Sequence, residues 1–221
     1  MILPSEGDFK AAIEGASLDL GPRMVDQAAR FAAILHRENQ KQNLTRILGV
    51  GEFVSDHLLD AIELIRAPAL GGIVADLGTG SGVPGLLAAA LDEEGSRQWF
   101  LIESEINKAN YLRETAKEMG LERANVVHGR IETVLSQLKP DTVTARALGN
   151  VEKISAWIWS CSTWNNLLLF KSRGWQEEWN EAKTSRFGKK LTVTHSHDYS
   201  SPEKTRLLIT LNRPKMNNLF C

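Results

Sequence analysis

The chain has few cysteines and no long apolar run. Its 221 residues include only two cysteines, Cys161 and Cys221, which lie far apart and form no Cys-x-x-Cys spacing. A disulfide framework and a zinc knuckle are therefore not expected. No segment approaches the roughly 20 apolar residues that a membrane helix requires, and the first residues lack a basic stretch followed by an apolar run. These absences predict a cytoplasmic protein without membrane contact.

The chain also lacks an excess of charge of either sign, because 26 Lys/Arg and 27 Asp/Glu give a formal net charge of −1. The average conceals a polarised distribution. Residues 1–70 hold seven basic and ten acidic residues, whereas residues 171–221 hold ten basic and five acidic. A chance fluctuation along a neutral chain would look the same. If the partner is a polyanion, we expect it to bind the C-terminal half.

The hydrophobic residues are spaced in three successive patterns. Helical spacing over 22–42 and 53–65 predicts helices in the first seventy residues. After residue 72, short apolar runs alternate with helical stretches, which predicts a parallel sheet covered on both faces. The predicted parallel strands are 73–75, 99–102, 125–128, 142–145 and 167–170. Residues 190–197 and 205–212 alternate without a helix between them and predict a terminal antiparallel pair.

A glycine-rich segment, DLGTGSGVPG from Asp76 to Gly85, follows the first predicted parallel strand. Glycine tolerates the positive φ of a turn in which backbone approaches a ligand, and we expect Gly78, Gly80, Gly82 and Gly85 to use this freedom. A helix should begin near Pro84, with its N–H groups facing the crevice at the strand ends. The segment also satisfies G-x-G-x-x-G, so the glycines alone leave a dinucleotide-dependent oxidoreductase open.

Asp76 separates the two kinds of cofactor. A carboxylate two residues before the first glycine would repel the pyrophosphate of a dinucleotide, whereas S-adenosylmethionine (SAM) carries a sulfonium and an ammonium that complement it. Glu103 ends the next predicted strand and is placed to accept hydrogen bonds from ribose hydroxyls, which either cofactor has. We therefore predict an α/β fold of the class I SAM-dependent methyltransferases. This fold is Rossmann-like, with a mostly parallel seven-stranded sheet and helices on both faces. The expected organisation is an N-terminal helical extension (1–70), a methyltransferase domain (71–214) and a tail (215–221).

The chain lacks the sequence motifs that several kinds of nucleic-acid methyltransferase use. After the fourth predicted strand the chain reads TARAL, not the Asn/Asp-Pro-Pro-aromatic box that grips an exocyclic amine. Cys161 has no base nearby in sequence, so we interpret it as a small buried hydrophobe rather than a nucleophile. The ring nitrogen N7 of guanine needs neither device, because its lone pair is free and alignment suffices. A small-molecule N-methyltransferase satisfies the same argument.

The chain resembles the bacterial RsmG (GidB) family, which methylates guanine N7 in 16S (small-subunit) ribosomal RNA. The resemblance is spread over most of the length, and its most diagnostic element is Val83-Pro84-Gly85 after the glycines. Its other elements are Asn43-Leu44-Thr45, His57-Leu58-Leu59-Asp60, Asp76 to Gly82, Lys108 with Tyr111-Leu112-Arg113, Arg130-Ile131-Glu132, Arg146-Ala147 and Phe170-Lys171.

The resemblance assigns roles to these residues. It implies that Arg146, at the boundary between cofactor and substrate, carries the catalytic role. The cofactor pocket it implies comprises Asp76, Gly78, Gly80, Val83, Glu103 at the ribose, Ile131 and Glu132 at the adenine, and Arg146. The residues it turns towards RNA are Lys108, Arg113, Arg130 and Lys171. The implied partner is small-subunit rRNA or the 30S particle, bound by a monomer; DNA is not expected.

Several positions depart from the family pattern on the RNA-facing side. Relatives usually place aromatics where this chain has Glu38, Gln42 and Leu148, and a glycine where it has Ser172. No metal is expected, because His195-x-His197 lacks a third ligand. His57 is interpreted as a helix-packing or capping residue. A non-catalytic RNA-binding module on the same fold remains an alternative.

Overall fold

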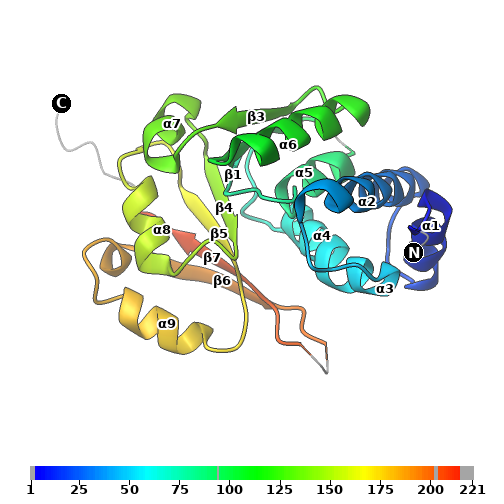
Figure 1. Ribbon diagram of the computed structural model, residues 1–221. Helices are drawn as coiled ribbons and strands as arrows, with labels where there is room; N and C mark the ends of the chain where they lie inside the picture. The colour runs from blue at the N-terminus through cyan, green and yellow to red at the C-terminus, as the bar shows by residue number, and fades with distance from the viewer. Residues whose placement is uncertain (1–2, 94, 202–203, 215–221) are drawn as a thin grey trace.

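The computed structural model describes residues 3–93, 95–201 and 204–214, so the predicted tail at 215–221 and Cys221 lie outside the described residues (Figure 1). Its α-helices are α1 (Glu6–Gly15), α2 (Pro22–Gln42), α3 (Val50–Phe53), α4 (Leu59–Arg66), α5 (Gly85–Leu91), α6 (Ile106–Glu118), α7 (Ile131–Leu138), α8 (Val151–Ile158) and α9 (Trp175–Ala182). A π-helical turn, η1 (Val54–Leu58), joins α3 to α4, and a 3₁₀ turn, η2 (Gly188–Lys190), follows α9. Within these ranges no helix is long and apolar enough to cross a membrane.

Seven strands form one sheet in the order β3-β2-β1-β4-β5-β7-β6. They are β1 (Ile73–Leu77), β2 (Gln98–Glu103), β3 (Ala124–His128), β4 (Thr142–Arg146), β5 (Asn166–Lys171), β6 (Thr192–Asp198) and β7 (Leu207–Asn212). The first five pair in parallel, and β7 lies antiparallel between β5 and β6. The predicted strands and their directions are confirmed. Strand order reverses between β1 and β4, where α/β sheets bind ligands.

Two hydrophobic cores lie on opposite faces of the sheet, because successive strand residues point to opposite sides. Val74 belongs to the core beneath α2, α4, α5 and α6, whereas its neighbour Ala75 belongs to the core beneath α7, α8 and α9. Figure 1 shows the blue and cyan helices on one side of the sheet and α8 and α9 on the other. Both faces are therefore covered, as the apolar strands require.

The N-terminal helices share the first of these cores. Phe9, Phe31 and Phe53, from α1, α2 and α3, are each 0% exposed and cluster with core residues of β1, β2 and α5. The rings of Phe9 and Phe53 meet edge to face with centroids 5.4 Å apart. Residues 1–70 were predicted as an extension, and their described part packs on the sheet as an integral layer.

This shared core predicts cooperative unfolding. Phe31→Ala should lower the free energy of unfolding by about 3–5 kcal/mol, because it leaves a cavity beneath the sheet. All six tryptophans lie beyond residue 70, yet their fluorescence in a denaturant titration should report this loss as a single shifted transition. Leu48→Ala is the control, since Leu48 is 54% exposed. Two separate transitions would contradict the shared core.

Candidate cofactor and substrate site

The glycine-rich turn after β1 forms a backbone cradle at the strand-order switch. Gly78, Gly80 and Gly82 have φ of +62°, +59° and +88°, in the left-handed region that favours glycine. Gly85 was expected to need the same freedom, and this expectation is wrong because its φ is not positive. It is needed for close packing instead: a Cβ there would lie 2.3 Å from Oδ2 of Asp76. The start of α5 thus rests directly on β1.

Asp76 is buried at the base of the cradle, with 1% of its surface exposed. Its Oδ2 accepts a hydrogen bond from the Gly85 N–H at 3.2 Å. Its Oδ1 is buried and has no hydrogen-bond partner among the described residues. Burial raises the pKa of Asp76 to about 7. A buried acceptor that lacks a donor fits a cationic ligand, as the SAM prediction requires.

Glu103 braces the cradle from the end of β2. Its Oε2 accepts from the Gly80 N–H at 3.0 Å, and its Oε1 accepts from the Glu105 N–H at 2.8 Å. These bonds hold the carboxylate still, and each oxygen keeps a second lone pair for a hydroxyl. Glu103 is therefore both a structural support of the loop and a fixed acceptor, and its contact with a ribose stays a prediction.

A small cavity of about 80 Å³ lies beside the cradle, on the β2 and β3 side. Ile131 and Glu132, at the start of α7, line it together with Gly78 and Leu148. Leu148 sits so close that a Cβ on Gly78 would lie 2.6 Å from its Cδ1. This is the predicted adenine position. Val83, which was predicted to line the cofactor pocket, is 6% exposed and packs against the first core.

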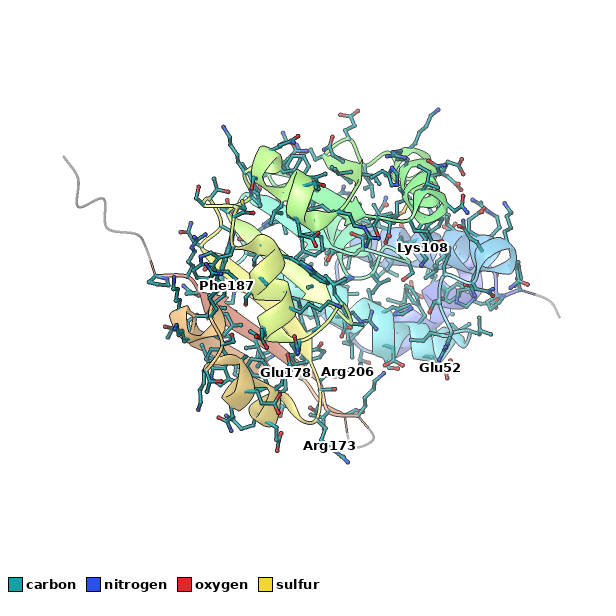
Figure 2. The ribbon with its side chains drawn as sticks, turned by 60° about the vertical axis from the view of Figure 1, so that its left-hand side comes forward. Glu52, Lys108, Arg173, Glu178, Phe187 and Arg206 are labelled. Atoms are coloured by element: carbon teal, nitrogen blue, oxygen red, sulfur yellow. The ribbon has the colours of Figure 1, made fainter. Side chains whose placement is uncertain are left out.

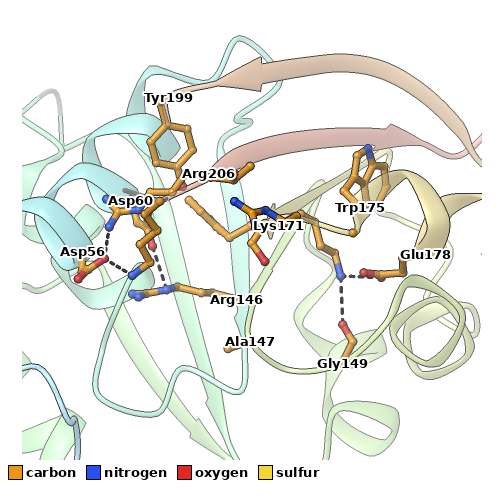
Figure 3. A pocket seen from close by; sticks show the side chains of 16 residues that line it. Asp56, Asp60, Arg146, Ala147, Gly149, Lys171, Trp175, Glu178, Tyr199 and Arg206 are labelled. Atoms are coloured by element: carbon orange, nitrogen blue, oxygen red, sulfur yellow. Dashed lines mark hydrogen bonds and ion pairs between the residues drawn. The ribbon is translucent and has the colours of Figure 1, made fainter. Parts of the chain in front are cut away.

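A larger pocket of about 430 Å³ opens on the opposite side of β4, towards β5 and β7. The turn after β4 separates the two cavities, with Arg146 facing the large one and Leu148 the small one. Between them, Ala147 has a φ of +53°, a strained conformation for a residue with a Cβ. Figure 3 shows this turn at the base of the pocket.

Each carboxylate that lines the large pocket is engaged by a cation. Nε of Arg146 lies 2.9 Å from Oδ2 of Asp60, whose Oδ1 accepts from the Tyr199 hydroxyl at 2.7 Å. The corresponding pair on the other wall is Lys171 and Glu178, at 2.7 Å. Asp56 pairs with both Lys204 and Arg206 (Figure 3).

The four predicted RNA-facing residues do not form one cluster. Lys108 and Arg113 lie on α6, and Arg130 caps α7, all on the side of the small cavity. Lys171 lies inside the large pocket, where its side chain is 9% exposed and donates to the Gly149 carbonyl at 3.1 Å. In Figure 2, Lys108 is well separated from Glu178, the partner of Lys171. Lys171 is thus a pocket-wall residue rather than a free surface cation.

Several pocket residues were not predicted as site residues. Asp60 was recognised only as part of a motif, and Tyr199 and Arg206 carried no signal beyond the basic character of the C-terminal half. Arg206 lies in the loop before β7 and is 7% exposed. The motif His57-x-x-Asp60 was the one usable clue, because a polar pair within an apolar helix is costly to bury without partners.

His57 sits in the π-helical turn, with 4% of its surface exposed, and its Nδ1 lies 3.2 Å from Nη1 of Arg146. Burial and the neighbouring guanidinium lower the pKa of His57 to about 4, so its ring is neutral at pH 7. Of the other histidines, His195 and His197 stack on β6 with centroids 6.4 Å apart. Among the described residues no group of three or more potential metal ligands gathers.

Comparison with solved structures agrees with this architecture. The METTL16 methyltransferase domain matches 95% of this chain and 92% of its own length, with a TM-score of 0.56 and 13% identity. M. capricolum TrmK, solved with S-adenosyl-homocysteine, matches 70% of this chain and 68% of its own, with a TM-score of 0.55 and 12% identity. The strand order and the cradle define the class I SAM-dependent methyltransferase fold.

Sequence comparison identifies the family within that class. The family model described as rRNA small subunit methyltransferase G (GidB) matches residues 24–208. The chain belongs to this family, and the predicted fold class and family are confirmed.

Two relatives carry the name ribosomal RNA small subunit methyltransferase G. The one from Stenotrophomonas maltophilia (strain K279a) is 38% identical over 140 residues, which cover 63% of this chain and 64% of the relative. The one from Rhodopirellula baltica is 32% identical over 181 residues, which cover 80% and 76%.

The buried carboxyl predicts that SAM affinity depends on pH. Below about pH 7 Asp76 holds a proton that a cationic ligand must displace, so affinity should rise by up to about tenfold per pH unit from about pH 5.5 and level off above pH 7. Titration calorimetry in buffers of different ionisation enthalpy would show the released proton. Asp76→Asn should bind more weakly and lose the pH dependence. Asp26→Asn, on the exposed face of α2, should keep it; a pH-independent wild-type affinity would contradict the assignment.

Proposed function

We propose that this chain transfers the methyl group of SAM to N7 of a guanine in 16S ribosomal RNA. Bound SAM supplies an electrophilic methyl group on a sulfonium. Asp76 and Glu103 would hold the cofactor from the cradle, and the target base would enter the large pocket across the Arg146 turn. The pocket would align the N7 lone pair with that methyl group, so that the new N–C bond would replace the methyl–sulfur bond, whose electrons would stay on sulfur.

The engagement of the pocket carboxylates carries the proposal for N7. Asp60 and Glu178 are each within 2.9 Å of a cation, and Asp56 pairs with Arg206. Burial raises the pKa of Asp60, and Arg146 and Tyr199 oppose that rise. Both of its carboxylate oxygens are nevertheless already engaged, Oδ2 by Arg146 and Oδ1 by the Tyr199 hydroxyl. A substrate that had to lose a proton would have to pass it to a carboxylate that a cation already engages. Guanine N7 carries no proton, so a site that only aligns and desolvates is sufficient.

The charge and size of the pocket favour a nucleotide over a small metabolite. Its lining includes the three carboxylates and the five cations Arg146, Lys171, Arg173, Lys204 and Arg206. The excess of positive charge suits a phosphate backbone. A cavity of about 430 Å³ has room for a nucleotide unstacked from its neighbours, which is how RNA bases are presented to enzymes. Lys108, Arg113 and Arg130 would extend the contact along the sheet edge.

The same proposal covers the assembly and location of the enzyme. We propose that it acts as a monomer on the 30S particle or on its rRNA, in the cytoplasm. The names of the relatives and the basic pocket wall support this substrate.

The proposal is tested by methylation of unmodified small subunits. Subunits from cells that lack the family enzyme should gain label from methyl-labelled SAM at one guanine, and cleavage chemistry specific for N7-methylguanine should map it. Asp76→Ala should abolish labelling, because the cofactor cradle loses its acceptor. Arg23→Gln, on the far surface at the start of α2, should label normally. RNA that stays unlabelled while a metabolite is methylated, or tight NAD binding without SAM binding, would refute the proposal.

A further inference from the structure

A chain of polar contacts runs from Arg146 into the N-terminal helices. Its Nε lies 2.9 Å from Oδ2 of Asp60 in an ion pair, and its Nη1 donates to Nδ1 of His57 at 3.2 Å. The other ring nitrogen of His57, Nε2, lies 3.1 Å from Oγ1 of Thr45. Because Nδ1 accepts from a guanidinium, which cannot accept in return, the single proton of the neutral ring is on Nε2 and points to Thr45.

Thr45 is itself held from both sides. Its N–H donates to Oδ1 of Asn39 at 2.8 Å, and its carbonyl accepts from Nδ2 of Asn39 at 3.0 Å. Its hydroxyl also accepts from the Ile47 N–H at 3.1 Å. Asn39 lies at the end of α2 with 8% exposure. The orientation of the His57 ring is therefore set by the N-terminal helices.

The π-helical turn η1 brings His57 to Arg146. Such a turn inserts an extra residue into a helix and occurs often at functional sites. Here it places Asp56, His57 and Asp60 on one side, where they contact Arg206, Arg146 and Tyr199. Phe53 packs edge-on against the His57 ring, at 6.0 Å and 89°. The imidazole is thus fixed by packing as well as by hydrogen bonds.

The chain limits what Arg146 can offer a guanine. Arginine usually binds guanine through O6 and N7 together, which would cap the lone pair that must attack. With Nε beside Asp60 and one Nη1 hydrogen donated to His57, Nη2 is the guanidinium nitrogen for which no partner is found among the described residues. A contact made through Nη2 alone suits O6 and leaves N7 open.

We propose that His57 is a positioning residue that, together with Asp60, orients Arg146 so that its Nη2 donates to O6 of the target guanine while N7 stays free. The inference rests on the proposed function. It assigns the N-terminal layer a part in the reaction: Asn39 and Thr45 orient His57, and His57 orients Arg146.

The test is a double-mutant cycle on the single-turnover rate with unmethylated small subunits. His57→Leu removes both ring nitrogens and should slow methylation by about 100-fold, as a misplaced contact does, while calorimetry shows the SAM Kd unchanged. His57→Gln, whose amide can both accept and donate, should restore most of the rate. Arg146→Met should be slow, and adding His57→Leu to it should cause no further loss. His195→Leu, on the exposed edge strand, is the matched control.

The outcomes separate this inference from the proposed function. If the wild type labels no RNA, the proposed function fails before the cycle begins. A second outcome is that the wild type is active while the double variant shows the product of the rate losses of His57→Leu and Arg146→Met. In that case His57 does not act through Arg146, and the inference is overturned. Equal rates for His57→Gln and His57→Leu, with both variants folded by thermal melting, would overturn it as well.

Discussion

The buried ion pair between Arg146 and Asp60 joins the parts of the molecule that form the site. Arg146 ends β4 at the strand-order switch, and Asp60 lies in α4 of the N-terminal layer with 4% exposure. Removing two charges from water is expensive, and an apolar pair would often stabilise a fold as well. The pair instead fixes where Arg146 lies relative to α4. Tyr199 is fixed at the same place, because its hydroxyl donates to Asp60 at 2.7 Å. Helical layer, parallel sheet and terminal hairpin therefore meet at one carboxylate.

The backbone turn after β4 explains how neighbouring residues at the end of one strand line two different cavities. Ala147 adopts a left-handed conformation that most residues avoid. This reversal directs Arg146 to the large pocket and Leu148 over Gly78, beside the small cavity. Where relatives usually place an aromatic, Leu148 still covers the cradle. The departure therefore alters the wall between cofactor and substrate rather than the cofactor contacts of Asp76 and Glu103.

Local patterns predicted the sheet and the cradle, because strand periodicity, glycine turns and acidic strand ends are properties of short segments. The larger pocket depends on contacts that short segments do not encode. Tyr199 and Asp60 are 139 residues apart in sequence, and Arg206 and Asp56 are 150 apart. The resemblance implied that Lys171 faces RNA, but nothing local indicated that Glu178, one turn into α9, would hold it in the pocket wall.

The hairpin that closes the pocket is also the last part of the site to be synthesised. Chains are synthesised from the N-terminus, so the residues of the helical layer and the parallel strands, including Asp76 and Glu103, are made before the segment from Tyr199 to Arg206. The residues of the cradle are present early, whereas the pocket gains its last wall when β7 pairs with β5. A nascent chain of this protein would thus hold the means to recognise a cofactor before it holds a complete place for a substrate.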